Sequence, residues 1–149
     1  MTRIVVCLLL LFAADSGFGR EVTISSYRFL YADAELVVIA KPHGTKFTTE
    51  KTKLEGVEVL GVSTEFEVVV LMKGETALKY FVLHHYAEKE NRLADGLNLV
   101  WFPYDPKEPR SSPSYLLFLR KEADGRYAPV NTQADPALSS VVKLPAHGD

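Results

Sequence analysis

The longest region of alternating hydrophobic and polar residues runs from Val57 to Lys73. In its second half, one set of alternate residues is mostly apolar: Thr64, Phe66, Val68, Val70 and Met72. The intervening set begins with Glu65 and Glu67 and ends with Lys73. Alternate side chains of a β-strand point to opposite faces of a sheet. The pattern therefore predicts a strand with the first set in the core and the second set facing solvent.

Other runs of apolar and β-branched residues predict further short strands. These runs are Val22–Phe29, Leu36–Ala40, Leu78–Tyr86, Leu97–Phe102, Tyr115–Arg120, Tyr127–Val130 and Ser139–Leu144. Turn-forming residues separate them, at Lys41–Gly44, at Gly74 and at Gly125. The segment Tyr31–Glu35 is compatible with a helical turn, and Thr45–Glu55 is polar enough for a loop or an exposed edge.

These elements predict an all-β fold, a closed or partly closed antiparallel barrel of five to seven strands with one or two short helical turns. No segment keeps a helical period over a dozen residues, which disfavours an α/β fold. The chain has 149 residues and contains no internal repeat or linker, so one domain is expected over residues 20–149.

The N-terminal residues have the order of a secretory signal peptide. Arg3 gives a positive start, Ile4–Ala14 is an unbroken apolar run, and small or polar residues follow to Gly19. The alternative is a buried first strand. The run is shorter than the roughly 20 apolar residues that span a bilayer. We therefore expect residues 1–19 to be removed, after Gly17 or Gly19, and the protein to be secreted or periplasmic.

Composition narrows the class of protein further. The chain is 47% hydrophobic and 24% charged, which is typical of a globular protein. Its net charge is -2, and no basic block exceeds two residues, which argues against nucleic-acid binding. Cys7, the only cysteine, lies in the predicted signal, so the mature chain has no disulfide or thiolate metal site. This favours the bacterial envelope over a disulfide-rich animal protein, and no second segment is long enough to span a membrane.

Several segments resemble the secreted bacterial relatives of the netrin-like domain, over most of the chain beyond Tyr31. The matching segments are Asp33–Val38, Val70–Glu75, Tyr115–Leu119, Asp124–Tyr127, and Asp135–Ala137 before Ser140–Val142. That superfamily includes the tissue inhibitors of metalloproteinases and has an OB-type five-stranded barrel. The animal inhibitors act through a cysteine at the mature N-terminus, and this chain has none near Phe18 or Arg20. The resemblance therefore implies an OB-like fold without the inhibitory mechanism, since one barrel supports many functions.

No residue is predicted to be catalytic, to bind a cofactor or to bind a metal. Adjacent strand residues point to opposite faces, so we expect His84 and His85 to separate, one packed inward and one solvated. Pairing of one histidine with Glu88 or Glu90 is the alternative. Glu65 and Glu67 are expected to form a solvated stripe. The chain has no Gly-x-Ser-x-Gly nucleophile motif and no glycine-rich phosphate loop.

An OB-type barrel raises the possibility of nucleic-acid or sugar binding through aromatic and cationic side chains. Residues of these types are Tyr80, Trp101, Phe102, Tyr104, Arg110, Tyr115 and Arg120. An isoelectric point near 6 and the predicted export argue against nucleic acid. The preferred interpretation is that Trp101 and Phe102 fill and seal the barrel.

The sequence thus predicts a non-enzymatic binding or interaction module of the bacterial cell envelope, whose partner is another envelope protein or a saccharide. An inhibitor or modulator of a secreted hydrolase is the alternative. A small metal-assisted hydrolase is third, because its ligand set is incomplete.

Overall fold

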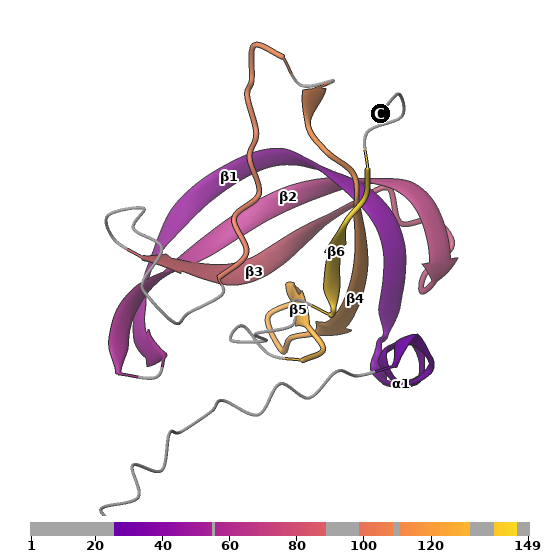
Figure 1. Ribbon diagram of the computed structural model, residues 1–149, viewed down its shortest axis with the longest axis horizontal. Helices are drawn as coiled ribbons and strands as arrows, with labels where there is room; N and C mark the ends of the chain where they lie inside the picture. The colour runs from indigo at the N-terminus through magenta and orange to yellow at the C-terminus, as the bar shows by residue number, and fades with distance from the viewer. Residues whose placement is uncertain (1–25, 55, 89–98, 109–110, 132–138, 146–149) are drawn as a thin grey trace, which may run out of the picture.

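The computed structural model describes residues 26–54, 56–88, 99–108, 111–131 and 139–145 (Figure 1). These contain one helix and six strands: α1 (Tyr27–Asp33), β1 (Leu36–Leu54), β2 (Val57–Lys73), β3 (Tyr80–Glu88), β4 (Tyr115–Lys121), β5 (Tyr127–Pro129) and β6 (Val141–Lys143). The prediction of an all-β fold with five to seven strands and one or two short helical turns is confirmed. The predicted signal peptide and its cleavage site lie outside the described residues.

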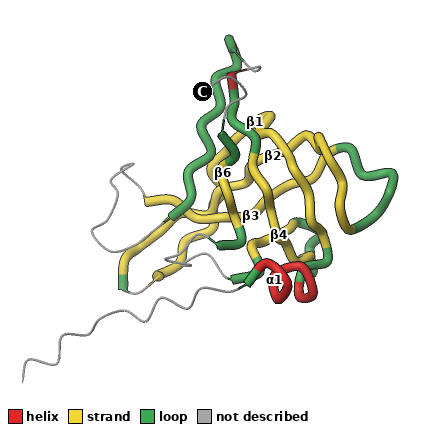
Figure 2. The backbone as a smooth tube through the Cα atoms, turned by 45° about the vertical axis from the view of Figure 1, so that its right-hand side comes forward, coloured by secondary structure: helices red, strands yellow, loops and turns green. Residues whose placement is uncertain are grey.

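The strands pair in the order β1-β2-β3-β5-β4, and β4 pairs in turn with β1, so five strands close a ring. β6 shares an edge of β4 with β5 (Figure 1). The pairs are antiparallel, as predicted, except for β3 and β5, which run parallel and meet at Leu83 and Tyr127. Residues 99–108 and 111–114 belong to a loop that projects beyond the ring (Figure 2).

The long curved strand β1 replaces a predicted turn. Val37–Ala40 pairs with both β2 and β4, Leu36 pairs with β4, and the rest of β1 pairs with β2 alone. The turn predicted at Lys41–Gly44 is wrong: the strand continues through Pro42 and bulges at His43. Proline is tolerated at position 42 because β1 no longer pairs with β4 there. The missing N–H of Pro42 therefore breaks no hydrogen bond between these two strands. Thr45–Leu54 forms the exposed end of the same strand, one of the two outcomes expected for that segment.

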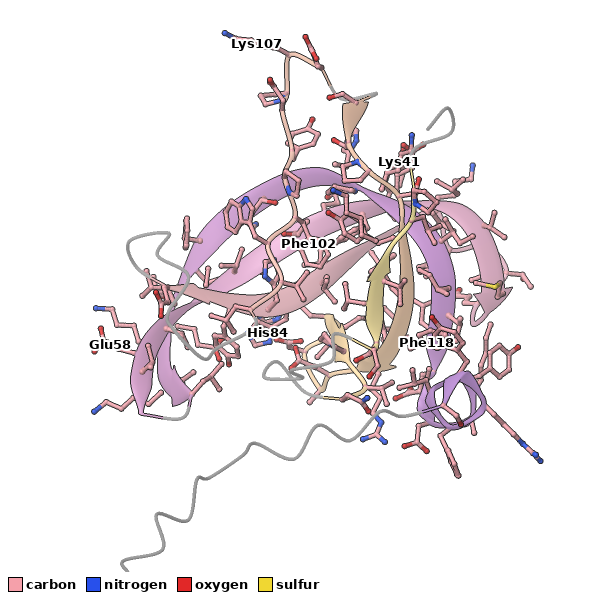
Figure 3. The ribbon with its side chains drawn as sticks, in the orientation of Figure 1. Lys41, Glu58, His84, Phe102, Lys107 and Phe118 are labelled. Atoms are coloured by element: carbon pink, nitrogen blue, oxygen red, sulfur yellow. The ribbon has the colours of Figure 1, made fainter. Side chains whose placement is uncertain are left out.

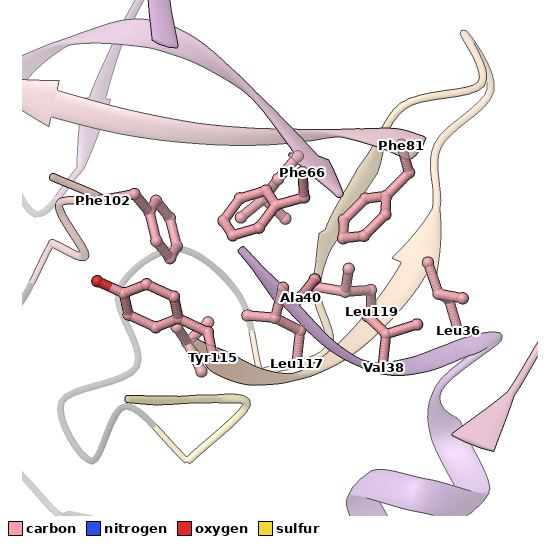
Figure 4. Close-up of a cluster of buried hydrophobic side chains, with 11 residues drawn as sticks. Leu36, Val38, Ala40, Phe66, Phe81, Phe102, Tyr115, Leu117 and Leu119 are labelled. Carbon is pink, nitrogen blue, oxygen red and sulfur yellow. The ribbon is translucent and has the colours of Figure 1, made fainter. Parts of the chain in front are cut away.

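The main core lies inside the ring and is built around aromatic rings (Figure 4). Phe66 stacks on Phe81 at 5.5 Å between ring centroids and meets the edge of Phe102 at 5.0 Å. Phe102 is 1% exposed, so it fills the ring as expected. Trp101 is 41% exposed and does not. Residues 99–102 form no strand, contrary to the prediction for that part of Leu97–Phe102.

The predicted core face of β2 is only partly correct. Thr64 and Phe66 are fully buried and Val68 packs against the core, but Val70 and Met72 are exposed. Ala40 pairs with Val68 and Ile39 with Val70, so the residue between has no partner of its own. Such a bulge shifts the alternation by one position. Leu71 consequently packs against the core in place of Val70 and Met72.

A second, smaller core lies beneath α1. Its buried members are Leu30, Ala34, Val37, Phe118 and Val130. The strand predicted at Val22–Phe29 is wrong where it is described, because Tyr27–Phe29 belongs to the helix. Burial of Leu30 against this cluster explains the helical conformation, since a short helix is stabilised by tertiary packing. No helix among the described residues has the length and apolarity needed to cross a membrane.

Candidate functional site

His84 and His85 point to opposite faces of β3, as predicted. His85 lies inside the ring, where its imidazole meets the edge of Phe102 at 5.0 Å, and His84 lies on the outer face. Both are buried, with exposed fractions of 4% and 2%. The expectation that one of them is solvated is therefore wrong. Side chains from other strands cover His84.

The interior histidine is part of a short chain of hydrogen bonds. His85 Nε2 lies 2.8 Å from Thr64 Oγ1, which lies 3.0 Å from Thr45 Oγ1. Burial, and secondarily the charge of His84, lower the pKa of His85 to about 4. His85 is thus neutral at neutral pH, and its contacts inside the ring are structural.

On the outer face, His84, which is labelled in Figure 3, lies between two carboxylates. Its Nδ1 atom is 2.9 Å from Glu122 Oε2, and its Nε2 atom is 3.2 Å from Glu50 Oε2. The Tyr86 hydroxyl donates a hydrogen bond of 2.6 Å to Glu50 Oε1. Glu50 belongs to β1, the histidine and tyrosine to β3, and Glu122 directly follows β4. We call these four residues, together with Arg126, the His84 cluster.

A bulge in β1 brings Glu50 over the neighbouring strand. Phe47 pairs with Val62 and Lys51 with Leu60, so three residues of β1 lie opposite Gly61 alone. A Cβ atom on Gly61 would lie 2.5 Å from Thr48 Oγ1 and 3.0 Å from Glu50 Cβ. The absence of a side chain at Gly61 leaves the space in which Glu50 crosses β2 to reach β3. Bulges commonly redirect a side chain in this way.

The turn between β4 and β5 provides the other side of the His84 cluster. Arg126 Nε lies 2.6 Å from Asp124 Oδ2, and the Arg126 N–H donates a hydrogen bond to Asp124 Oδ1 at 3.0 Å. Gly125 has φ of 88°, a backbone conformation that favours glycine. The guanidinium also lies 3.7 Å from Glu50 Oε2. The turn is thereby fixed against the bulge of β1.

The hydrogen bond between Tyr86 and Glu50 shifts the titration of both groups. The Tyr86 hydroxyl lowers the pKa of Glu50, and the charges of His84 and Arg126 add to this effect against the opposing burial. Burial first, and then the bond to Glu50, raise the pKa of Tyr86 to about 12. At neutral pH Glu50 is therefore an acceptor and Tyr86 a donor.

The geometry of the His84 cluster limits its chemistry. The two carboxylates contact opposite nitrogens of one imidazole, so they cannot both join that ring in binding one metal ion. Among the described residues, no group of three or more His, Cys, Asp and Glu side chains could hold a metal ion. A general base needs a nitrogen facing its substrate, and both nitrogens of His84 contact carboxylates. The arrangement ties the β1–β2 hairpin to the β4–β5 turn.

Two adjoining pockets lie beside the His84 cluster, and both are lined by Val82. The first has a volume of about 280 Å³ and is lined by Gly44, Thr45, Lys46, Ser63, Glu65 and Val82. The second has a volume of about 310 Å³. Its walls include Tyr80 of β3 and Lys121, Asp124, Arg126 and Tyr127 of the β4–β5 hairpin. We call the two pockets together the Val82 groove.

Of the aromatic and basic residues considered from the sequence, one lines the groove, two are buried in the core, and the other described ones make separate contacts outside the core. Tyr80 lines the groove and is 50% exposed. Phe102 and Tyr115 are buried in the core. Trp101 stacks on Phe47, and Tyr104 contacts the ring of His43. Arg120 pairs with Asp33 at 2.8 Å, and Arg110 lies outside the described residues.

Of the acidic residues considered from the sequence, Glu65 and Glu67 lie outside the His84 cluster. Glu65 and Glu67 are both exposed, as predicted, and Glu65 lines the groove. Glu90, one of the two glutamates considered beside the histidines, lies outside the described residues. Among the described residues, Glu50 and Glu122 contact His84, and the sequence analysis did not select them. Gly61 inside a strand pattern was the available signal, since such a glycine often marks a bulge.

No protein-family model matches the chain, and no curated protein sequence matches it. The netrin-like resemblance therefore remains a prediction.

Proposed function

We propose that this protein is a non-catalytic binding module of the bacterial cell envelope, exported by its N-terminal segment, and that its ligand binds in the Val82 groove. The observation that carries the proposal is the pair of pockets that meet at Val82 of β3. Ligand sites are concave, few per protein and of roughly 300–1,000 Å³. The two adjoining pockets together have that size.

The position of the groove in the sheet supports this proposal. OB-type barrels bind ligands on the face formed by strands 2 and 3, flanked by the loops between strands 1 and 2 and between strands 4 and 5. Here the groove includes Ser63 and Glu65 of β2 and Val82 of β3. The β4–β5 turn borders it at Asp124 and Arg126. The His84 cluster joins that turn to the β1–β2 hairpin, which makes the site pre-formed.

The proposal of a non-catalytic role rests on the contacts of the titratable groups nearest the groove. His84 has a carboxylate at each nitrogen, and the Tyr86 hydroxyl is bonded to Glu50. A nucleophile and a base in mutual contact would be needed for covalent catalysis. In the His84 cluster, the titratable side chains are instead held in ion pairs and hydrogen bonds with one another.

Fragment binding followed by amide NMR spectra tests the proposal. A library of small uncharged polar fragments would be titrated into the isotope-labelled protein. We expect the shifted amides to concentrate around Val82, Ser63 and Arg126, since a pre-formed pocket binds many fragments weakly. Fragment sites scattered over the surface, or concentrated on α1, would contradict the assignment of the groove.

A further inference from the structure

We infer that the ligand of the Val82 groove is a neutral oligosaccharide. This inference rests on the function proposed above and names the class of ligand. It is drawn from the charge balance of the groove and from the exposed aromatic ring that lines it.

The lining of the groove has no excess of either charge. Its basic side chains are Lys46, Lys121 and Arg126, and its acidic side chains are Glu65, Glu75 and Asp124. Arg126 is moreover paired with Asp124 at 2.6 Å. Nucleic acids and other polyanions require a positively charged groove. Three cations matched by three anions instead offer hydrogen-bond donors and acceptors to an uncharged ligand with many hydroxyl groups.

One exposed aromatic ring lies at the side of the groove formed by β3. Tyr80, which lines the second pocket, is half exposed, and its ring lies 5.9 Å from that of His43. The ring of His43 in turn lies 6.2 Å from that of Tyr104. The half-exposed ring of Tyr80 is thus held in place while part of it faces solvent. An aromatic ring of this kind can pack against the apolar C–H face of a sugar, and nearby polar groups can bind the hydroxyls.

The two pockets meet at Val82 and together reach from Lys46 of β1 to Lys121 at the end of β4. A groove that crosses several strands in this way suits a chain of several sugar units better than a single one. The stacked pair of Phe47 and Trp101 does not belong to it, because Phe47 pairs with Val62 and so lies on the inner face of the sheet.

Titration calorimetry with defined oligosaccharides tests the inference. The probes are chitohexaose, cellohexaose and maltohexaose, with a single-stranded oligothymidylate as the polyanion. We expect at least one hexasaccharide to bind with a Kd at or below about 1 mM. We expect that Kd to stay nearly constant when salt is raised, because a neutral ligand displaces no counterions. Failure of all three hexasaccharides to bind, or tighter binding of the oligothymidylate, would overturn the inference.

Two alanine variants locate the binding. Tyr80→Ala should weaken binding of the hexasaccharide roughly fivefold or more, by analogy with the loss of an aromatic stacking platform. Phe29→Ala is the matched control, since Phe29 is 71% exposed on α1 and lies in neither pocket. Equal weakening by Phe29→Ala would contradict the inference. If polar fragments cluster in the groove but no hexasaccharide binds, the ligand class is wrong and the proposed function stands; scattered fragments contradict both.

Discussion

Gly61 of β2 lies directly beneath Glu50 of β1, so closely that a Cβ atom on Gly61 would come within 3.0 Å of the Glu50 Cβ atom. The bulge that carries Glu50 depends on the absence of a side chain at Gly61. The approach of the Glu50 carboxylate to His84, at 3.2 Å, depends on it as well. One glycine thereby connects the course of β1 to the ion pairs beside the groove.

Gly61→Ala should therefore destabilise the protein by about 1–3 kcal/mol, the usual cost of overpacking. The added methyl group would also meet Thr48 Oγ1 at 2.5 Å, so the bulge must move. Gly44→Ala is the control, because a Cβ atom there has no neighbour within 4 Å. Urea unfolding of the two variants provides the comparison. Equal midpoints would mean that the bulge accommodates a side chain and that Gly61 does not position Glu50.

The contact between His84 and Glu122 should contribute more to stability than an exposed ion pair of the same length. Hydrogen bonds to charged groups contribute about 1.5–3 kcal/mol, and exposed ion pairs about 0.2–1 kcal/mol. His84 is buried and lies 2.9 Å from Glu122, whereas Arg120 and Asp33 are 2.8 Å apart and more than half exposed. Double-mutant cycles with alanine at each position measure both couplings. A coupling for Arg120 and Asp33 as large as that for His84 and Glu122 would refute the structural role of the cluster.

His85 makes the stability depend on pH. Burial lowers its pKa from 6.5 to about 4, so between these values the unfolded chain binds a proton that the folded protein does not. Stability from this group is present above pH 6.5 and is lost as the pH falls toward 4, by about 2 kcal/mol between pH 7 and pH 5. His85→Gln should remove that loss, because glutamine does not titrate. Denaturant unfolding of both proteins at the two pH values measures the difference, and an unchanged pH dependence in the variant would show that His85 is not the group responsible.

Substitution by aspartate should lower the stability much more at Val68 than at Val70, although simple alternation puts both residues in the core. Val68 packs against the core, whereas Val70 is 45% exposed after the bulge. Val68→Asp should cost several kcal/mol, because it places an unpaired carboxylate against apolar side chains. Val70→Asp should cost less than about 1 kcal/mol, as solvated substitutions usually do. Similar denaturation midpoints for the two variants would mean that β2 keeps a regular alternation without the bulge.

The sequence predicted the all-β class because strand alternation and turn residues are local signals. Phe66 and Phe102 could be assigned to the core in this way. The end of the helix at Tyr27–Asp33 overlaps the helical turn predicted at Tyr31–Glu35. Its beginning could not be predicted, because the helical conformation depends on burial of Leu30 against Phe118, a contact distant in the sequence. The bulges in β1 and β2 were not predicted for the same reason. A residue can be recognised as the extra one of a bulge only when its partner strand is known.

The site was harder to predict than the fold. His84 and His85 are adjacent in sequence and were correctly placed on opposite faces of β3. Their partners come from other strands: Thr64 for the inner histidine, and Glu50 and Glu122 for the outer one. No local spacing connects these residues. Closure of the ring brings them together.

The most direct test of the binding groove is to fill it at the residue shared by its two pockets. Val82→Trp would place a large side chain between them, and Val69→Trp, at a position 54% exposed on the far end of β2, is the matched control. The measurement is the set of amide shifts caused by the same polar fragments in the wild type and both folded variants. We predict that the shifts around Ser63 and Arg126 disappear in Val82→Trp and persist in Val69→Trp. Unchanged fragment binding in Val82→Trp would contradict the assignment of the groove as the ligand site.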